Sequence, residues 1–171
     1  MSSNELPVQV DAAARRQRVV VALAVAVLVE TGLVLGHFAH GARVYEDPAR
    51  LHVVTPATVF AVLALLLCGA YLWRPSPLTR RLLGGQVAFV YVAVFGGYHG
   101  AFSHAAKDLL FLAGVGPERL ESIFDSPDFA LPNDVMFELT GLATLGVAVV
   151  VLWLLIRLFR LPDASSRACL R

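Results

Sequence analysis

Four long apolar segments constrain the fold of this 171-residue chain more than any other feature. A helix that crosses the hydrocarbon core of a bilayer needs about 20 apolar residues, each adding about 1.5 Å. Only Glu30 and Glu138 carry charge inside the segments, and each segment is bounded by charge, proline or polar residues. The pattern predicts an all-α membrane protein, a four-transmembrane-helix bundle with spans at residues 19–39, 53–73, 82–102 and 135–156.

The composition agrees with a membrane protein and argues against other classes. Hydrophobic residues make up 57% of the chain and the mean hydropathy is +0.69, both above the values of soluble globular domains. A β-barrel would show alternating segments of about ten residues, whereas these runs are continuously apolar. The net charge of +1 includes no basic stripe, so we expect no nucleic-acid partner. The bilayer is the predicted partner.

The distribution of basic residues predicts the orientation, because short cytoplasmic loops of membrane proteins are enriched in Lys and Arg. With the N-terminus inside, residues 1–18 and 157–171 form cytoplasmic tails around a transmembrane domain at 19–156, and 103–134 form an outer loop. We therefore expect a multi-pass protein of the plasma membrane, the inner membrane of a bacterium. The inner side then holds most of the basic residues: Arg15, Arg16, Arg18, Arg74, Arg80, Arg81, Arg157, Arg160, Arg167 and Arg171.

Two similar pentapeptides close the first and third spans at their outer ends. The first reads Phe-Ala-His-Gly-Ala at residues 38–42, and the second reads Phe-Ser-His-Ala-Ala at 102–106. One interpretation is a bundle of two pseudo-symmetric helical hairpins related by an axis along the membrane normal. The alternative is that small residues are simply common in these helices.

Histidines and one carboxylate gather at the predicted outer face. His37, His99 and Glu138 come from three different spans, and each lies roughly 3 to 6 Å below the same interface. Nitrogen and oxygen donors at one depth on three helices are what a metal site inside a bundle needs. His40 and His104 lie at the rim, where they would complete the metal site or meet water. The alternative is that all these side chains are solvated at helix ends.

The outer end of the third span is the boundary that the pattern defines least. His99 and His104 are five residues apart, so a continuing α-helix would turn their rings about 140° from each other. Both could then bind one ion only if the helix were kinked. Asp108 follows His104 by four residues, and its carboxylate is predicted to orient the His104 ring. Asn133 or Asp134 is the expected N-cap of the fourth helix.

The donor types narrow the choice of metal. Neither cysteine reaches the outer layer, and the only methionine besides Met1 is Met136, so Cu(I), which prefers sulfur, is disfavoured. Zinc, iron or manganese suits nitrogen and oxygen donors better. A b-type haem is an alternative cofactor, with His37 facing His99 across its iron.

Glu30 raises a separate question, because an ionised carboxylate near mid-bilayer is expensive. It must face the bundle interior and be protonated or paired. It lies two helical turns, about 10 Å, from His37 on nearly the same face, which is typical of a proton or cation path. The alternative is a protonated glutamic acid hydrogen-bonded to a neighbouring helix.

The sequence carries no motif for ATP, dinucleotide or nucleophilic catalysis. The leading hypothesis is therefore a membrane oxidoreductase or metal-handling protein with an outer-face His/Glu site. Three alternatives stay open: a proton- or cation-coupled transport component that uses Glu30, a non-catalytic accessory subunit, and a b-type haem electron carrier. A homo-oligomer or a larger membrane complex is expected, and the outer loop would serve as a lid or as a docking surface.

Overall fold

The chain forms a bundle of four long helices, here described from a computed structural model that covers residues 5–124 and 131–161. Helices α1, α2 and α6 are single elements, whereas the third long helix is continuous through α3, η2 and α4. Two short helices, η1 and α5, lie in the connections. The bounds are α1 Glu5–Val44, η1 Pro48–Val53, α2 Val54–Trp73, α3 Pro77–Val87, η2 Ala88–Ala106, α4 Lys107–Leu112, α5 Pro117–Ile123 and α6 Val135–Phe159.

All four long helices are apolar and long enough to cross a membrane, which confirms the predicted fold class. Much of the surface of the bundle is made of large apolar side chains, as expected of helices that face lipid rather than water. Examples from three helices are Leu28, Leu66 and Val149, each at least half exposed. The bundle therefore contacts the lipid bilayer along its sides.

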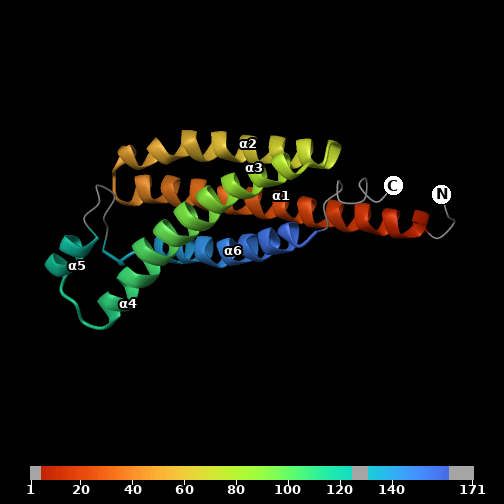
Figure 1. Cartoon of the computed structure of the whole chain (residues 1–171). Coiled ribbons are helices and arrows are strands. Elements are labelled where there is room, and N and C mark those ends of the chain that lie inside the picture. Colours follow the sequence, from red (N-terminus) through yellow and green to blue (C-terminus); the bar gives the residue numbers. More distant parts are fainter. Residues whose placement is uncertain (1–4, 125–130, 162–171) are drawn as a thin grey trace.

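Helix α1 occupies the centre of the bundle. Figure 1 shows it between α2 and α6, while the continuous helix α3–η2–α4 crosses the other helices obliquely. The packing agrees with this view, because α1 lies against α2 and α6, and η2 lies mainly against α6. Helices one, three and four of the chain thus meet, which the sequence alone does not establish.

Small residues allow η2 to approach α6 closely. A Cβ atom added at Gly96 would meet the Cβ of Ala148, and one added at Gly100 would meet the backbone of Leu145 and the hydroxyl of Thr144. The two glycines are four residues apart, the spacing that lets helix backbones approach in lipid, where burial from water does not drive association. The contact fixes the third helix against the fourth next to the histidines.

The third helix differs from the expectation in length and in type. It continues to Leu112, ten residues beyond the predicted end of the apolar run at residue 102. Over Ala88–Ala106 it is a π-helix, with i→i+5 hydrogen bonds, and the Ser103 hydroxyl donates to the carbonyl of Tyr98 five residues earlier at 3.1 Å. This helix type changes which side chains share a face.

The helix ends follow local sequence signals. Asp134 is the N-cap of α6, and its Oδ1 accepts the backbone N–H of Phe137 at 2.7 Å, as one of the two predicted caps. Ser76 and Thr79 form a capping box ahead of α3, with Pro77 in the first turn, where a proline costs no hydrogen bond. These caps fix where α3 and α6 begin.

The two similar pentapeptides do not share an environment. His40 of the first is half-buried and bonds Asp134, whereas His104 of the second is 2% exposed and bonds Glu138. The first lies on an α-helix and the second on the π-helix. Any relation between the two hairpins is therefore not carried by equivalent histidines.

Candidate metal site

Three histidines from two helices meet near one end of the bundle. His37 comes from α1, and His99 and His104 come from η2. One nitrogen from each lies within 4.8 Å of the other two, a spacing that could hold a metal ion. The ring centroids are 4.6 Å apart for His37 and His99, 4.8 Å for His37 and His104, and 4.9 Å for His99 and His104. We call these residues the histidine triad.

The π-helix explains why His99 and His104 are both in the triad. A π-helix needs about 4.4 residues per turn, so a five-residue step is close to one full turn. In an α-helix the same step would separate the rings by about 140°. The expected divergence of the two rings was wrong for this reason, because it assumed α-helical geometry.

A hydroxyl on α6 holds the ring of His37. Its Nδ1 lies 3.0 Å from Oγ1 of Thr140, and the same oxygen lies 2.8 Å and 3.0 Å from the carbonyls of Met136 and Phe137. Since the single hydroxyl proton goes to a carbonyl, Oγ1 accepts the Nδ1–H of His37. The lone pair of this neutral ring is then on Nε2, which is buried and has no hydrogen-bond partner in the described parts of the chain.

A carboxylate on α6 holds the ring of His104. Oε2 of Glu138 lies 2.5 Å from His104 Nδ1, and Oε1 accepts from Lys107 Nζ at 3.0 Å. All three side chains are buried. The ammonium of Lys107 balances the charge of Glu138. The Nδ1–H of His104 is donated to the carboxylate, which leaves the lone pair of a neutral ring on Nε2.

His99 provides the third nitrogen. Its Nε2 is buried and has no hydrogen-bond partner among the residues described. The Nε2 atoms of His37 and His99 are thus left for a ligand, and His104 Nε2 is the nitrogen opposite the one bonded to Glu138. Metal-binding histidines usually donate the N–H of the ring nitrogen that does not bind the metal to a carboxylate or another oxygen. This hydrogen bond fixes the tautomer, and His37 and His104 both show it.

A glycine makes room for the His104 ring. A Cβ atom added at Gly141 would overlap Cδ2 and Cγ of that ring. Gly141 lies on α6, one turn after Glu138, so the same helix provides both the hydrogen-bond acceptor and the space. The position of His104 thus depends on α6 in two ways.

Aromatic rings pack against the histidines of the triad. Phe137 stacks on His37 at a centroid distance of 4.0 Å, and Phe38 stacks on His99 at 5.1 Å. Tyr45 packs edge-on against Phe137 at 5.2 Å. These contacts exclude water, which lowers the local dielectric and strengthens the bond between a metal and neutral ligands.

The remaining predicted site residues lie near the triad but have other partners. Nε2 of His40 lies 2.9 Å from Oδ1 of Asp134. Glu138 bonds His104 and Lys107, as described above. Asp108 interacts with Glu138, and no hydrogen bond joins it to His104 within the described residues, so Glu138 takes the orienting role that was expected of Asp108.

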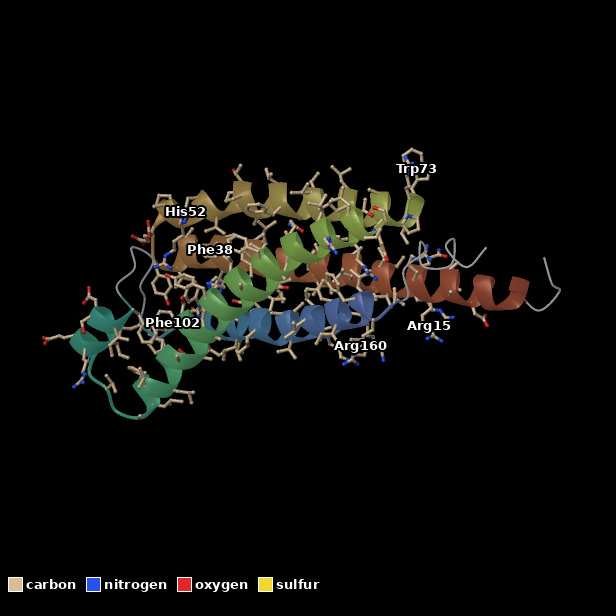
Figure 2. All side chains as sticks on the ribbon, viewed as in Figure 1. Arg15, Phe38, His52, Trp73, Phe102 and Arg160 are labelled. Atoms are coloured by element: carbon tan, nitrogen blue, oxygen red, sulfur yellow. The ribbon has the colours of Figure 1, made fainter. Side chains whose placement is uncertain are left out.

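All five histidines lie towards the same end of the bundle. His52 is next to Phe38, with ring centroids 6.4 Å apart, and Figure 2 shows both at the end opposite Arg15 and Arg160. Nδ1 of His52 bonds the carbonyl of Ala49 at 2.7 Å. This grouping agrees with the histidine distribution expected from the sequence.

Two titratable groups just outside the spans have shifted pKa values. The backbone N–H of Phe137, and then the side chain of His40, lower the pKa of Asp134. Burial, and then the negative charges of Glu138 and Asp134, raise the pKa of Tyr45. Its phenol is therefore a hydrogen-bond donor at neutral pH, and it donates to Asn133 Oδ1 at 3.0 Å.

Glu30 lies deeper in the bundle, apart from the triad. Its side chain is completely buried, and neither carboxyl oxygen has a hydrogen-bond partner in the part of the chain that the structure describes. The nearby hydroxyls of Thr31 and Tyr91 lie 3.3 Å from each other. The prediction that Glu30 faces the bundle interior is thus consistent with its burial.

Four residues of the site were missed by sequence reasoning: Thr140, Lys107, Gly141 and Arg50. The spacing of Gly141 from Glu138 could have indicated that it lies on the same helix face. No local signal marks the other three. Comparison of the chain with protein-family models, curated proteins and solved structures found no match.

Proposed function

We propose that this multi-pass membrane protein binds one divalent metal ion through the Nε2 atoms of His37, His99 and His104 and acts as a membrane oxidoreductase. The observation that carries the proposal is the convergence of three imidazole nitrogens within 4.8 Å. Two of the rings are fixed from their opposite nitrogens, by Thr140 and Glu138. Pre-oriented, neutral and buried nitrogen donors favour a metal over a proton.

The donor set favours iron or zinc. Imidazole suits zinc, iron, copper and nickel, whereas manganese prefers carboxylate and water ligands. Glu138, the carboxylate predicted as a ligand, is already bonded to His104 and Lys107. Of the two metals that the donor set favours, iron would support electron transfer directly, whereas zinc has no redox chemistry.

A resident, reactive ion fits the site better than an ion in transit. Three protein ligands leave a fourth coordination position open, as in catalytic rather than structural metal sites. His37 and His104 are nearly inaccessible, so frequent exchange of the ion would require the bundle to open. These features favour an oxidoreductase over a metal-handling protein.

The geometry disfavours a haem between His37 and His99. Two axial nitrogens at about 2 Å from an iron would place the ring centroids about 6 Å apart, with the porphyrin between them. The two centroids are 4.6 Å apart, and the rings meet edge to face. A single ion fits this spacing, and a haem does not.

We infer that the site faces the outer side of the plasma membrane, the bacterial inner membrane. Arg15 and Arg160 lie at the end of the bundle opposite His52 (Figure 2). Basic residues near the ends of spans favour the cytoplasmic side. Both termini would then be cytoplasmic.

The test is to purify the protein in detergent without a histidine tag and to measure bound metals by mass spectrometry with a visible absorption spectrum. We expect close to one zinc or iron per chain in the wild type and loss of the metal in His37→Ala, His99→Ala and His104→Ala. His40→Ala and His52→Ala are the controls, because these rings lie outside the triad, and both variants should retain the metal. Absence of metal from the wild type, or its retention in all three triad variants, would overturn the proposal.

A second candidate function, proton- or cation-coupled transport, rests on Glu30. A buried carboxyl group without a partner inside a membrane span is a common feature of ion pathways. In liposomes with an imposed pH gradient, this function predicts proton flux that Glu30→Gln abolishes. Glu46→Gln, at an exposed position, should leave the flux unchanged. Equal flux through the wild type and Glu30→Gln would contradict it.

A further inference from the structure

Arg50 is a buried cation whose nitrogens are not fully paired. It belongs to η1, between α1 and α2, and is 3% exposed. Its Nε and Nη1 atoms have no hydrogen-bond partner among the described residues. A buried charge without a full set of partners is costly, so such a side chain is typical of a binding site for the opposite charge.

Among residues 5–124 and 131–161, the carboxylate that pairs with Arg50 is that of Asp47, and it does so weakly. Oδ2 of Asp47 lies 3.5 Å from Arg50 Nε, and the Asp47 side chain is 35% exposed. Its other oxygen accepts the backbone N–H of Ala49 at 3.1 Å, which caps η1. Water around Asp47 screens its charge, so the positive charge of Arg50 is only partly compensated.

Arg50 lies close to the histidine triad. Its guanidinium carbon is 5.5 Å from the centroid of the Phe137 ring, which stacks on the His37 ring at a centroid distance of 4.0 Å. It also lies over the Tyr45 ring at 4.8 Å. At most about 10 Å therefore separates the guanidinium from His37, a distance over which two charges still interact appreciably in a medium of low dielectric.

The charges around a bound metal would not balance without a further anion. Three neutral imidazoles leave the two positive charges of the ion in place. Of the nearby acidic groups, Glu138 is already paired with Lys107, and Asp108 interacts with the same two side chains. Arg50 adds positive charge on the outer side. In a buried site, an uncompensated charge of this size favours an anionic ligand at the open coordination position.

We propose that the fourth coordination position of the metal receives a small monovalent anion, and that the buried charge of Arg50 draws this anion in and stabilises it. The proposal rests on the metal site of the proposed function and names the class of ligand or substrate for it. The anion approaches the ion from the side of Phe137, whose ring packs against both the Arg50 guanidinium and the His37 ring. Arg50 acts here as a positioning residue through its charge.

The test uses the full-length protein in detergent, loaded with Co(II) as a spectroscopic substitute for the native metal, and azide as the anion. The visible bands of cobalt report a change in its ligands. We expect azide to shift these bands, and Arg50→Met to weaken azide binding by roughly tenfold, since a unit charge at about 10 Å has an effect of that size at an effective dielectric constant near 20. Affinity for cobalt should change much less.

The control is Arg43→Met, which removes a positive charge from an exposed position near the end of α1. It should leave azide binding within about twofold of the wild type, because solvent screens exposed charges. Two further variants decide the matter if Arg50→Met does not fold. Asp47→Asn keeps the cap but removes the opposing charge, so azide should bind more tightly, and Arg50→Lys should bind azide within a few-fold of the wild type.

The outcomes separate the two proposals. If the wild type binds no cobalt, the metal site and the anion site both fail. If cobalt binds but azide does not change its spectrum, only the anion proposal fails. The same conclusion follows if Arg50→Met and Arg43→Met bind azide equally, or if Arg50→Met does not fold and Asp47→Asn leaves azide affinity unchanged.

Discussion

Replacement of Gly141 by alanine should remove the metal by displacing one histidine. The added Cβ would overlap Cδ2 and Cγ of His104, atoms near the base of a ring that is fixed at Nδ1 by Glu138. Gly146 is the matched control, since it lies on the same helix and a Cβ there meets nothing within 4 Å. Both variants gain the same helix propensity, about 1 kcal/mol for alanine over glycine, so their difference isolates the overlap.

The size of the effect can be worked from that overlap. Inserting a methyl group into a packed core costs about 1 to 3 kcal/mol, and each kcal/mol lowers the melting temperature of a chain of this size by about 2 to 4 °C. Gly141→Ala should therefore melt about 2 to 12 °C below Gly146→Ala when both are apo. Metal affinity, measured by competition with a chelator, should fall at least tenfold in Gly141→Ala only. Removal of a residue that merely orients a metal-binding histidine already lowers metal affinity by about 10- to 100-fold, and displacement of the histidine itself should cost no less. Equal metal affinity in the two variants would refute the role given to His104.

Three further results are expected. Lys107→Met should destabilise the protein by about 3 to 5 kcal/mol, because it removes the cation that pairs with the buried charge of Glu138. The double variant Lys107→Met/Glu138→Leu should recover much of this stability but not metal binding. Chemical denaturation in detergent measures the stability of both variants. Because the pKa of Asp134 is lowered in the folded protein, its carboxylate stabilises the fold above the ordinary aspartate pKa of about 3.9. This stabilisation is lost as the pH falls through the folded-state pKa. The melting temperatures of the wild type and Asp134→Asn should therefore converge only in acid. Deletion of Ala101 should turn one π-helical turn into an α-helical one and retain metal binding, whereas insertion of an alanine there should abolish it.

Much of the architecture could be predicted from the sequence, because the thickness of the bilayer sets a minimum length for an apolar segment that crosses it. The four spans and the N-cap at Asp134 follow from local patterns of this kind. So does the shared depth of His37 and His99, since all-helical spans keep depth in register with sequence. Depth, however, gives no lateral position, so the sequence could not show that α1, η2 and α6 meet.

The sequence could not identify the hydrogen-bond partners of the site, because these depend on how the helices are rotated. Asp108 is four residues from His104 and was expected to orient its ring, yet Glu138 on another helix does so. The rotation of α6 is set by close contacts, in which Gly141 lies under His104 and Thr144 lies against Gly100. Such contacts arise from packing between segments distant in sequence, which no local spacing rule contains.

The geometry of the triad depends on the π-helix, and the rarity of this helix type favours a functional role for it. Pi-helical turns are rare, and they occur frequently at functional sites. Here the π-helix spans Ala88–Ala106, so it contains both His99 and His104 and ends at the residue before Lys107. With α-helical geometry over the same residues, either His99 or His104 would face away from His37, and Lys107 would lose its place relative to Glu138. The wider turn brings the two histidines and the lysine next to α1 and α6 together, so the same backbone feature sets both the ligand positions and the contact of Lys107 with Glu138.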